Sequence, residues 1–262
     1  MNNKLKSILR PFVNTLFHLG FDPRKLLSVR FYPRFRSHKS QWLKQGGNIT
    51  HSFMILSDYS DSAGNVKGHY FHQDLLVAKL INEHNPKRHI DVASRVDGFV
   101  AHVASFREIE VVDIRPLAKS EHANIIFQQA DLMSPHNLGE TDSLSCLHAI
   151  EHFGLGRYTD PIDVDGHNKG ITNLVSLVSI GGRFYISFPI GQSDEVHFNA
   201  HRVLHPSTIF KHPSISKCMN LVRFDYVDDN GDFHPNCDVS DVNAETKYGC
   251  GIYTFEKVSH IE

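Results

Sequence analysis

Residues 143–149, Ser-Leu-Ser-Cys-Leu-His-Ala, form an apolar run followed at once by Ile-Glu-His, and a second apolar run, Arg-Phe-Tyr-Ile-Ser-Phe, occupies residues 183–188. Both runs are short and rich in apolar side chains, which is typical of buried strands. The segment between them, residues 167–179, spaces its apolar residues as a helix does. A strand, a helix and a second strand in this order predict two parallel strands joined by a crossover helix. This stretch therefore indicates an α/β fold.

The same alternation continues along the chain in both directions. Asn85 and Pro86 end a helix that we expect over residues 73–84. We expect seven strands, at residues 89–93, 109–114, 125–130, 143–149, 183–188, 221–227 and 251–255. Further helices are expected near residues 98–106, 117–122, 167–179 and 206–212. This alternation predicts a seven-stranded, mainly parallel sheet with helices on both faces, a three-layer Rossmann-like arrangement.

The first 45 residues are strongly basic, because ten Lys and Arg residues are opposed by Asp22 alone. Apolar side chains recur with helical spacing from Leu5 to Leu16, which predicts an amphipathic helix. Such a helix suits an anionic membrane surface, and it is equally compatible with packing on the rest of the protein with its lysines in solvent. We therefore expect three parts: a basic amphipathic N-terminal extension at 1–45, a linker and loop at 46–69, and the α/β domain at 70–262.

The composition of the whole chain excludes several classes of protein. Its 262 residues, net charge of −2 and 40% hydrophobic residues fit a globular α/β protein with one main core. The four cysteines form no C-x-x-C pair, so we expect buried thiols in a reducing cytoplasm. No apolar run approaches the roughly 20 residues that cross a bilayer, and the N-terminus lacks the apolar core of a secretory signal. Basic residues confined to one terminus, without a nucleic-acid-binding motif, argue against a nucleic-acid partner.

In an open parallel sheet, ligands bind beyond the carboxyl ends of the strands, so the residues after each strand are the site candidates. After the first strand, the candidates for cofactor binding are Asp91, Ala93, Ser94, Arg95 and Gly98. Glycines in such a loop let the backbone approach a cofactor closely, and this loop has only one of them. Arg95 can pair with a carboxylate of the ligand. Asp91 can instead cap the following helix.

The second strand ends in Asp113, followed by Ile114. A carboxylate at this place can accept hydrogen bonds from both ribose hydroxyls of an adenosine. We therefore take Asp113 as the main cofactor residue, with Ile114 beside it. The alternative is a strand-end aspartate that caps the next helix.

The fourth strand is followed by His148, Glu151 and His152. A histidine at a strand end can lie beside a bound cofactor or take a proton from a substrate, because its pKa of about 6.5 is close to working pH. We take Glu151 and His152 as catalytic candidates and His148 as a cofactor neighbour. A single histidine in an apolar strand is more often structural.

A polar loop after the fifth strand contains Asn199, His201 and Arg202, whose donors suit a sugar hydroxyl, a carboxylate or a phosphate. We expect His201 to be a second candidate base. Asn199 and Arg202, together with Arg157 and Tyr158, are the candidates for binding the substrate. A hydrated loop stabilised by its own side chains is the alternative.

Three segments carry a resemblance: Asp-Val-Ala-Ser-Arg-Val-Asp-Gly-Phe at 91–99, Leu-His-Ala-Ile-Glu-His-Phe-Gly-Leu-Gly-Arg-Tyr at 147–158, and His-Phe-Asn-Ala-His-Arg-Val at 197–203. The chain resembles class I S-adenosylmethionine (SAM)-dependent methyltransferases, and among them a bacterial family of unknown function often encoded with surface-polysaccharide genes. The resemblance implies SAM as the cofactor and a last strand that inserts antiparallel. It also implies that Asp131 meets the adenine amino group and that Leu132 lies against the adenine ring.

The function implied is methyl transfer from SAM to a hydroxyl of a sugar, nucleotide-sugar or lipid-linked glycan during surface-polysaccharide biosynthesis. The expected location is the cytoplasm, with peripheral binding to the inner membrane through residues 1–45. Two alternatives stay open: a non-catalytic scaffold for a membrane glycosyltransferase complex, and a metal-dependent sugar-modifying enzyme that uses some of the 19 histidines. A divalent metal is not favoured, because no H-E-x-x-H or C-x-x-C motif occurs. The pattern defines neither metal ligands nor an oligomeric state.

Overall fold

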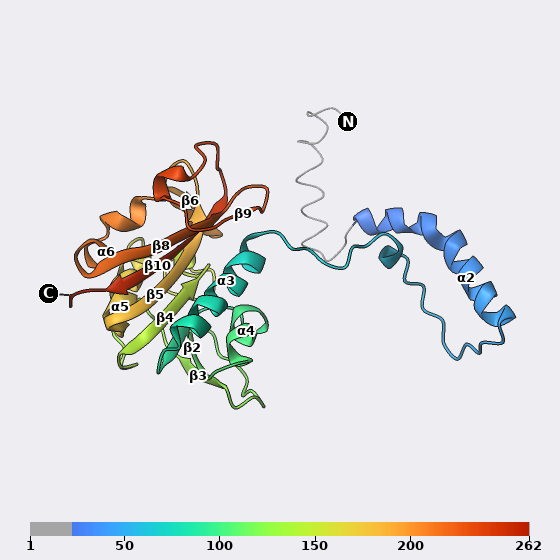
Figure 1. Ribbon diagram of the computed structural model, residues 1–262, viewed down its shortest axis with the longest axis horizontal. Helices are drawn as coiled ribbons and strands as arrows, with labels where there is room; N and C mark the ends of the chain where they lie inside the picture. The colour runs from blue at the N-terminus through green and yellow to red at the C-terminus, as the bar shows by residue number, and fades with distance from the viewer. Residues whose placement is uncertain (1–22, 262) are drawn as a thin grey trace. The chain divides into compact units, whose positions relative to one another are not determined.

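The computed structural model describes residues 23–261, which divide into two compact units between Asn65 and Val66 (Figure 1). The amphipathic helix predicted from Leu5 to Leu16 lies outside the described residues. Each unit has its own secondary structure. The sheet and the helices that cover it belong to the second unit.

The described part of the first unit contains one α-helix and two short 3-10 helices: α2 (Tyr32–Lys44), η1 (Pro23–Phe31) and η2 (Ser57–Tyr59). Pro33 lies in the first turn of α2, where the N–H that proline lacks has no helical partner. Trp42 Nε1 donates to the carbonyl of Asn48, which ties the end of α2 to the chain that follows. Helix α2 has no buried residue, so it forms without an apolar core of its own.

The second unit is built on an eight-stranded sheet (Figure 1). Its strands are β1 (His89–Val92), β2 (Ile109–Asp113), β3 (Ile125–Gln129), β4 (Thr141–Leu147), β5 (Val178–Ile190), β8 (Met219–Val227), β9 (Phe233–His234) and β10 (Gly249–Lys257). They lie in the order β3-β2-β1-β4-β5-β10-β8-β9. The first five strands in this order pair in parallel, and the pairs made by β10 and β9 are antiparallel. A separate hairpin consists of β6 (Glu195–His197) and β7 (His201–Val203).

All seven predicted strands are present, but the prediction of a seven-stranded sheet is wrong, because the sheet has eight strands and is mixed. The additional strand β9 pairs Phe233 with Val227 and His234 with Tyr226 at the sheet edge. A strand of two residues carries no period of apolar residues, so no pattern could predict it. The last strand, β10, lies antiparallel between β5 and β8, which confirms the insertion that the resemblance implied.

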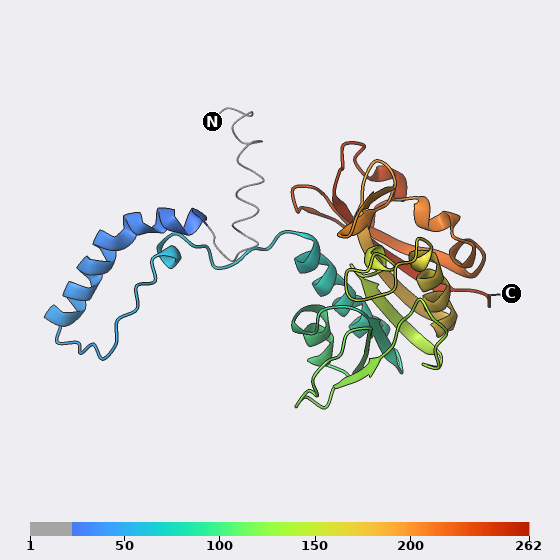
Figure 2. The same ribbon diagram turned by 180° about the vertical axis from the view of Figure 1, so that it is seen from behind.

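Helices cover both faces of the sheet (Figures 1 and 2). Residues of α3 (His69–His84), η3 (Val96–Val100) and α4 (Ala101–Ala104) pack in one core, and residues of α5 (Gly166–Leu177) and α6 (Pro213–Cys218) pack in the other. Side chains of β10 alternate between these cores, with Ile252 in the first and Tyr253 in the second. Burial on both faces explains why the strands read as nearly continuous apolar runs.

The predicted helix at residues 117–122 is absent. None of these six residues is buried, and so short a helix is not stable without an apolar face to bury. The helix predicted at 206–212 is a 3-10 turn, η5 (Thr208–Lys211), and α6 follows it. Helix α3 begins at His69 rather than at residue 73.

The cysteines are free thiols, and three of them are buried, as predicted: Cys146, Cys218 and Cys250. Cys237 is only partly buried, so the prediction of buried thiols is wrong for this residue. Among the described residues, no helix is both long and apolar enough to span a bilayer. The remaining short helices are η4 (Ile150–His152) and η6 (Val239–Asp241).

Candidate functional site

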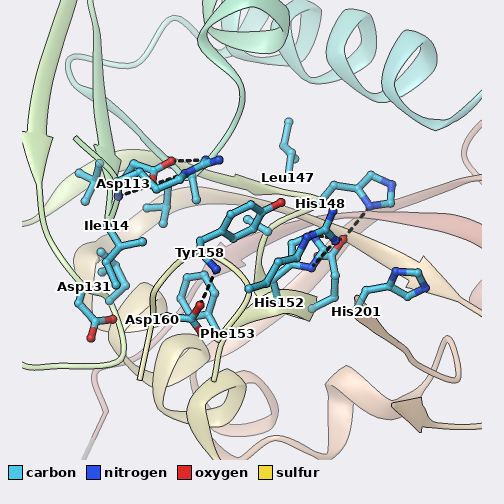
Figure 3. A pocket seen from close by; sticks show the side chains of 18 of the residues that line it. Asp113, Ile114, Asp131, Leu147, His148, His152, Phe153, Tyr158, Asp160 and His201 are labelled. Atoms are coloured by element: carbon cyan, nitrogen blue, oxygen red, sulfur yellow. Dashed lines mark hydrogen bonds and ion pairs between the residues drawn. The ribbon is translucent and has the colours of Figure 1, made fainter. Parts of the chain in front are cut away.

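A cavity of about 440 Å³ lies at the carboxyl ends of β1, β2 and β4 (Figure 3). The order of the strands reverses between β1 and β4, and open α/β sheets bind ligands at such a switch point. On one side the cavity is lined by six predicted cofactor residues: Ala93, Arg95, Asp113, Ile114, Asp131 and Leu132. On the other side it is lined by six more predicted residues: His148, Glu151, His152, Arg157, Tyr158 and His201. Five predicted residues do not line it: Asp91, Ser94, Gly98, Asn199 and Arg202.

Asp91 is buried behind the cavity and stabilises the turn that follows β1. Its Oδ1 accepts hydrogen bonds from Ser145 Oγ at 2.5 Å and from Ser94 Oγ at 2.8 Å. Its Oδ2 accepts a hydrogen bond from the Ser94 backbone N–H. Burial raises the pKa of Asp91 to about 7. Asp91 and Ser94 therefore stabilise the loop from behind. The helix that follows, η3, has no side-chain cap, so the alternative that Asp91 caps it is wrong.

Two residues that border the cavity have left-handed backbones. Ala93 has a φ of 64° and His148 a φ of 49°. This conformation costs an L-residue about 1–2 kcal/mol, and glycine avoids the cost. The Ala93 N–H donates to the Val112 carbonyl at 2.8 Å, which holds the turn in place. Class I methyltransferases usually have a glycine in this loop. At position 93 a glycine would adopt the left-handed backbone at a lower energetic cost than Ala93 does.

Gly98 has a packing role rather than a place in the cavity. A Cβ atom on Gly98 would lie 3.2 Å from Asp74 Oδ2, so glycine allows η3 to approach α3. Arg95 borders the cavity, and its guanidinium pairs with Asp97 at 2.7 Å at an exposed position. Such an exposed pair contributes little to stability and can open for a ligand.

Asp113 faces the cavity, but its carboxylate is already paired with Arg115. Arg115 Nη2 donates to Oδ2 at 2.5 Å and Nε donates to Oδ1 at 3.0 Å. The Arg115 guanidinium also lies 4.4 Å from the centre of the Tyr158 ring, in a cation–π contact. Arg115 was not a predicted site residue. Arg115 lies two residues after Asp113 in the bend that follows β2, where Asp113 Oδ1 also accepts a hydrogen bond from the Arg115 backbone N–H. An aspartate often forms such a turn with the residue two positions on, and this spacing could have indicated the pair.

Asp131 and Leu132 follow the end of β3, which pairs with β2, and Figure 3 shows Asp131 on the same side of the cavity as Asp113. Asp131 Oδ1 accepts a hydrogen bond from the Met133 N–H, and Leu132 is buried. Asn173 Nδ2 donates to the Leu132 carbonyl at 2.7 Å and so links this loop to α5. The cofactor side of the cavity thus combines two carboxylates with an apolar wall.

Glu151 lies between two histidines on the opposite side of the cavity. Its Oε1 accepts a hydrogen bond from His148 Nδ1 at 2.8 Å and lies 3.8 Å from His152 Nε2. The side chains of Glu151 and His148 are only 1% and 4% exposed. Burial opposes a charge on His148, but the neighbouring Cys250 and the Glu151 carboxylate together raise the pKa of His148 above its usual value. The Nδ1 atom of His148 is thus occupied by Glu151 and is not available as a base.

His152 is better suited than His148 to accept a proton. Its Nδ1 lies 2.7 Å from the Ala200 carbonyl, an acceptor, so Nδ1 carries the hydrogen and Nε2 is the basic nitrogen. Burial lowers the pKa of His152, which keeps the ring neutral near pH 7. Burial also lowers the pKa of His201, which lines the cavity and contacts the Tyr248 ring.

The predicted substrate residues divide into two groups. Arg157 and Tyr158 line the cavity, and Arg157 Nη1 also donates to the Ala200 carbonyl. Arg202 is buried outside the cavity, where Nη1 donates to the main-chain carbonyls of Glu151 and Phe153. Asn199 is exposed and also lies outside it. Arg202 thus positions η4, and direct contact of Asn199 or Arg202 with a substrate stays a prediction.

Asp160 is a further residue of the cavity that the sequence analysis missed. Its carboxylate accepts hydrogen bonds from the backbone N–H groups of Gly154, Gly156 and Tyr158. Both glycines have positive φ, so the loop that presents Tyr158 depends on them. The two glycines followed by an aspartate were the feature of the sequence that could have indicated Asp160. Tyr70 and Tyr248, from distant parts of the chain, also line the cavity, and no local pattern indicates them.

Comparisons with solved structures identify the architecture. A 1,6-didemethyltoxoflavin N1-methyltransferase from Burkholderia thailandensis, solved with its substrate and S-adenosylhomocysteine, is similar with a TM-score of 0.50 and 12% identity, over 88% of this chain and 90% of that one. The [4+2]-cyclase SpnF is similar with a TM-score of 0.51 and 12% identity, over 82% of this chain and 90% of that one. The chain therefore has the α/β Rossmann-like fold of SAM-dependent methyltransferases, as predicted. Because a cyclase also has this fold, the fold alone does not define the reaction.

A family profile described as "Caenorhabditis protein of unknown function, DUF268" matches residues 126–232. The match contains β4, η4 and the hairpin of β6 and β7, and it ends before β10. No curated protein matches the sequence.

Proposed function

We propose that this protein is a SAM-dependent methyltransferase that binds its donor in the cavity at the ends of β1, β2 and β3. The observation that carries the proposal is that two strand-end carboxylates, Asp113 and Asp131, line the same cavity as Glu151 and His152. Figure 3 shows His152 across the cavity from both carboxylates. A structure of the same fold contains S-adenosylhomocysteine. Donor and acceptor groups would thus meet at the switch point of the sheet.

The donor would lie along the strand ends. Asp113 would accept the ribose hydroxyls, Asp131 the adenine amino group, and Leu132 would pack on the adenine ring. Ala93 and Arg95 border the place for the methionine portion, and Arg95 could bind its carboxylate. SAM carries an already activated methyl group, so the protein contributes mainly by holding donor and acceptor in line.

The acceptor would be a hydroxyl that His152 deprotonates. His152 has a neutral imidazole with Nε2 unprotonated, and Glu151 Oε1 lies near this nitrogen. Glu151 Oε2 is buried with no hydrogen-bond partner among the described residues, so a polar group of a ligand would satisfy it. These features suit general-base catalysis on an oxygen nucleophile.

The substrate class we favour is a sugar or glycan, free, nucleotide-linked or lipid-linked, in surface-polysaccharide biosynthesis. Polar and aromatic side chains at the cavity, from Arg157, Tyr158, His201 and Tyr248, offer hydrogen bonds and ring faces of the kind that bind sugars. The basic residues 1–45, with Trp42 and Leu43 exposed on α2, support binding at an anionic membrane surface on the cytoplasmic side.

Calorimetry with SAM and with S-adenosylhomocysteine on the full chain tests the donor site. Asp113→Asn should weaken binding about tenfold or more, because hydrogen bonds to a charged group contribute about 1.5–3 kcal/mol. Glu108→Gln, at the opposite end of β2, is the matched control and should bind as the unaltered protein does. Absence of binding by the folded, unaltered protein would refute the proposal.

One observation favours the alternative of a non-catalytic protein with this fold: Arg115 occupies the Asp113 carboxylate. In that case the chain would act as a scaffold in a glycosyltransferase complex, through residues 1–45. A strain that carries Asp113→Ala would then keep its surface polysaccharide, and a strain lacking residues 1–45 would lose it. The methyltransferase proposal expects the methyl content of the glycan, measured by mass spectrometry, to fall in the Asp113→Ala strain.

A further inference from the structure

Two histidines and a cysteine meet beside the acceptor side of the cavity. His69, His148 and Cys250 each offer one ligand atom, and these atoms all lie within 4.8 Å of one another. The rings of His69 and His148 are nearly parallel, with centroids 5.2 Å apart. His148 and Cys250 are buried, and His69 is half-buried. None of the predicted functions uses His69 or Cys250.

The fold, and not the local sequence, brings these residues together. His148 follows β4, and its N–H donates to the Ser187 carbonyl of β5. Cys250 lies on β10, which pairs with β5 so that Cys250 is opposite Pro189. His69 begins α3, and the preceding residue, Gly68, donates to the carbonyl of Gly231. Elements far apart in the sequence thus hold each of the three side chains.

The orientation of His148 is the second observation that indicates a metal. Its Nδ1 is held by the buried Glu151 carboxylate at 2.8 Å, which makes Nε2 the free nitrogen. This Nε2 is buried and has no hydrogen-bond partner among the described residues. Histidines that bind metals usually donate their other ring N–H to a carboxylate in this way, which fixes the tautomer and the ring orientation. An unpaired buried nitrogen is costly unless a ligand satisfies it.

The chemistry of the three donors selects the metal. Two imidazole nitrogens and one thiolate form a borderline-soft set, which suits Zn²⁺, whereas Mg²⁺ and Ca²⁺ prefer oxygen ligands. Zinc is usually four-coordinate, and three protein ligands leave one position open for water or substrate, as in catalytic zinc sites. A bound metal would also replace the thiol proton of Cys250.

We infer that His69, His148 and Cys250 bind a zinc ion with one open coordination position. His148 belongs both to this cluster and to the lining of the cavity, so the open position adjoins the space for the acceptor. Zinc there can polarise an oxygen ligand and lower its pKa. That role toward an acceptor hydroxyl rests on the proposed methyl transfer, whereas binding of the ion itself does not.

Elemental analysis of the full chain, purified from zinc-supplemented medium, tests the site. The unaltered protein should hold one zinc ion per chain, and His69→Ala and Cys250→Ser should lose it. His72→Ala, one turn further along α3, and Cys218→Ser, another buried thiol, are the matched controls and should keep it. Circular dichroism shows whether each variant is folded.

Cobalt(II) spectroscopy on the unaltered protein keeps the test decisive if a variant does not fold. Cobalt in this site should show a thiolate-to-metal charge-transfer band together with the visible bands of four-coordinate geometry. A protein that binds neither zinc nor cobalt overturns the inference, as does zinc that persists in both folded variants or cobalt without the thiolate band. Calorimetry with SAM is a separate readout, so failure of the metal site and failure of the donor site are distinguishable.

Discussion

Arg115 occupies the carboxylate to which we assign the ribose of the donor. Asp113 Oδ1 accepts from both the Arg115 N–H and its Nε, and Oδ2 accepts from Nη2. Two ribose hydroxyls cannot bind the same carboxylate while this pair is closed. The Arg115 side chain is 41% exposed, so it can turn outward when a donor enters. Its contact with Tyr158 links this movement to the loop that borders the acceptor side.

Arg115→Met should therefore tighten SAM binding. Opening a partly exposed ion pair costs up to about 1 kcal/mol, which corresponds to about fivefold in Kd. Calorimetry on the variant measures this gain directly, with Arg107→Met, before the start of β2, as the control. Weaker binding by Arg115→Met would contradict competition and would show that Arg115 itself contacts the donor.

At the scale of elements, hydrogen bonds from side chains to main-chain carbonyls link the hairpin of β6 and β7 to η4 and the loop after it. His152 and Arg157 both contact the Ala200 carbonyl, and Arg202 donates to carbonyls of η4 and its C-terminal end. All three residues of β6 are exposed, whereas Arg202 and Val203 of β7 are buried, so packing holds only the β7 side of this hairpin. These hydrogen bonds place His201 and His152 next to each other at the cavity.

Arg202→Met should lower the free energy of unfolding by about 2 kcal/mol, because two carbonyls lose a donor in a buried place. Lys211→Met, which changes an exposed charge, should alter it by less than about 0.5 kcal/mol. Urea unfolding followed by circular dichroism is the suitable measurement, because the sole tryptophan, Trp42, lies in the first unit. Equal stability of the two variants would contradict the fastening role of Arg202.

At the scale of the whole molecule, a buried polar group links the central strands β1 and β4. His89 Nδ1 lies 2.8 Å from Ser143 Oγ, and Nε2 lies 3.1 Å from Ser145 Oγ. Ser145 Oγ in turn donates to Asp91. Burial lowers the pKa of His89 to about 3, so the ring stays neutral in the folded protein.

This neutral histidine makes stability depend on pH. Below about pH 6.5 the unfolded chain takes up a proton that folded His89 excludes until about pH 3. The contribution of neutral His89 to the free energy of unfolding is therefore complete above about pH 6.5. Below that pH it falls by up to about 1.4 kcal/mol per pH unit. The raised pKa of Asp91 acts in the opposite direction, so the comparison must be between variants.

His89→Gln should be less stable than the unaltered protein near neutral pH, because the two serine contacts are lost or weakened. Its stability should also decline less steeply between about pH 6.5 and pH 4, since the group that titrates only in the unfolded chain is gone. Urea unfolding of both proteins across this range gives the two slopes. Parallel slopes would exclude His89 as the source of the pH dependence.

Much of the fold was predictable, because strands buried on both faces leave apolar runs in the sequence. The runs before Asp113 and His148 gave strands whose carboxyl ends do meet at one cavity. The two-residue strand β9 left no such run. The helix predicted at 117–122 is absent because helix propensity alone does not stabilise so short a helix when it buries no apolar face.

The sequence by itself determined the order of elements and the strand ends that could form a site, because period and composition are local properties. Only the tertiary structure decided which of those residues face the cavity: Asp113 does, whereas Asp91 and Arg202 turn into the protein to satisfy buried polar groups. It also decided that His69 and Cys250 meet His148. Such contacts between distant residues depend on the strand order of the sheet and on where a distant helix begins. A local pattern of residues gives no information on either.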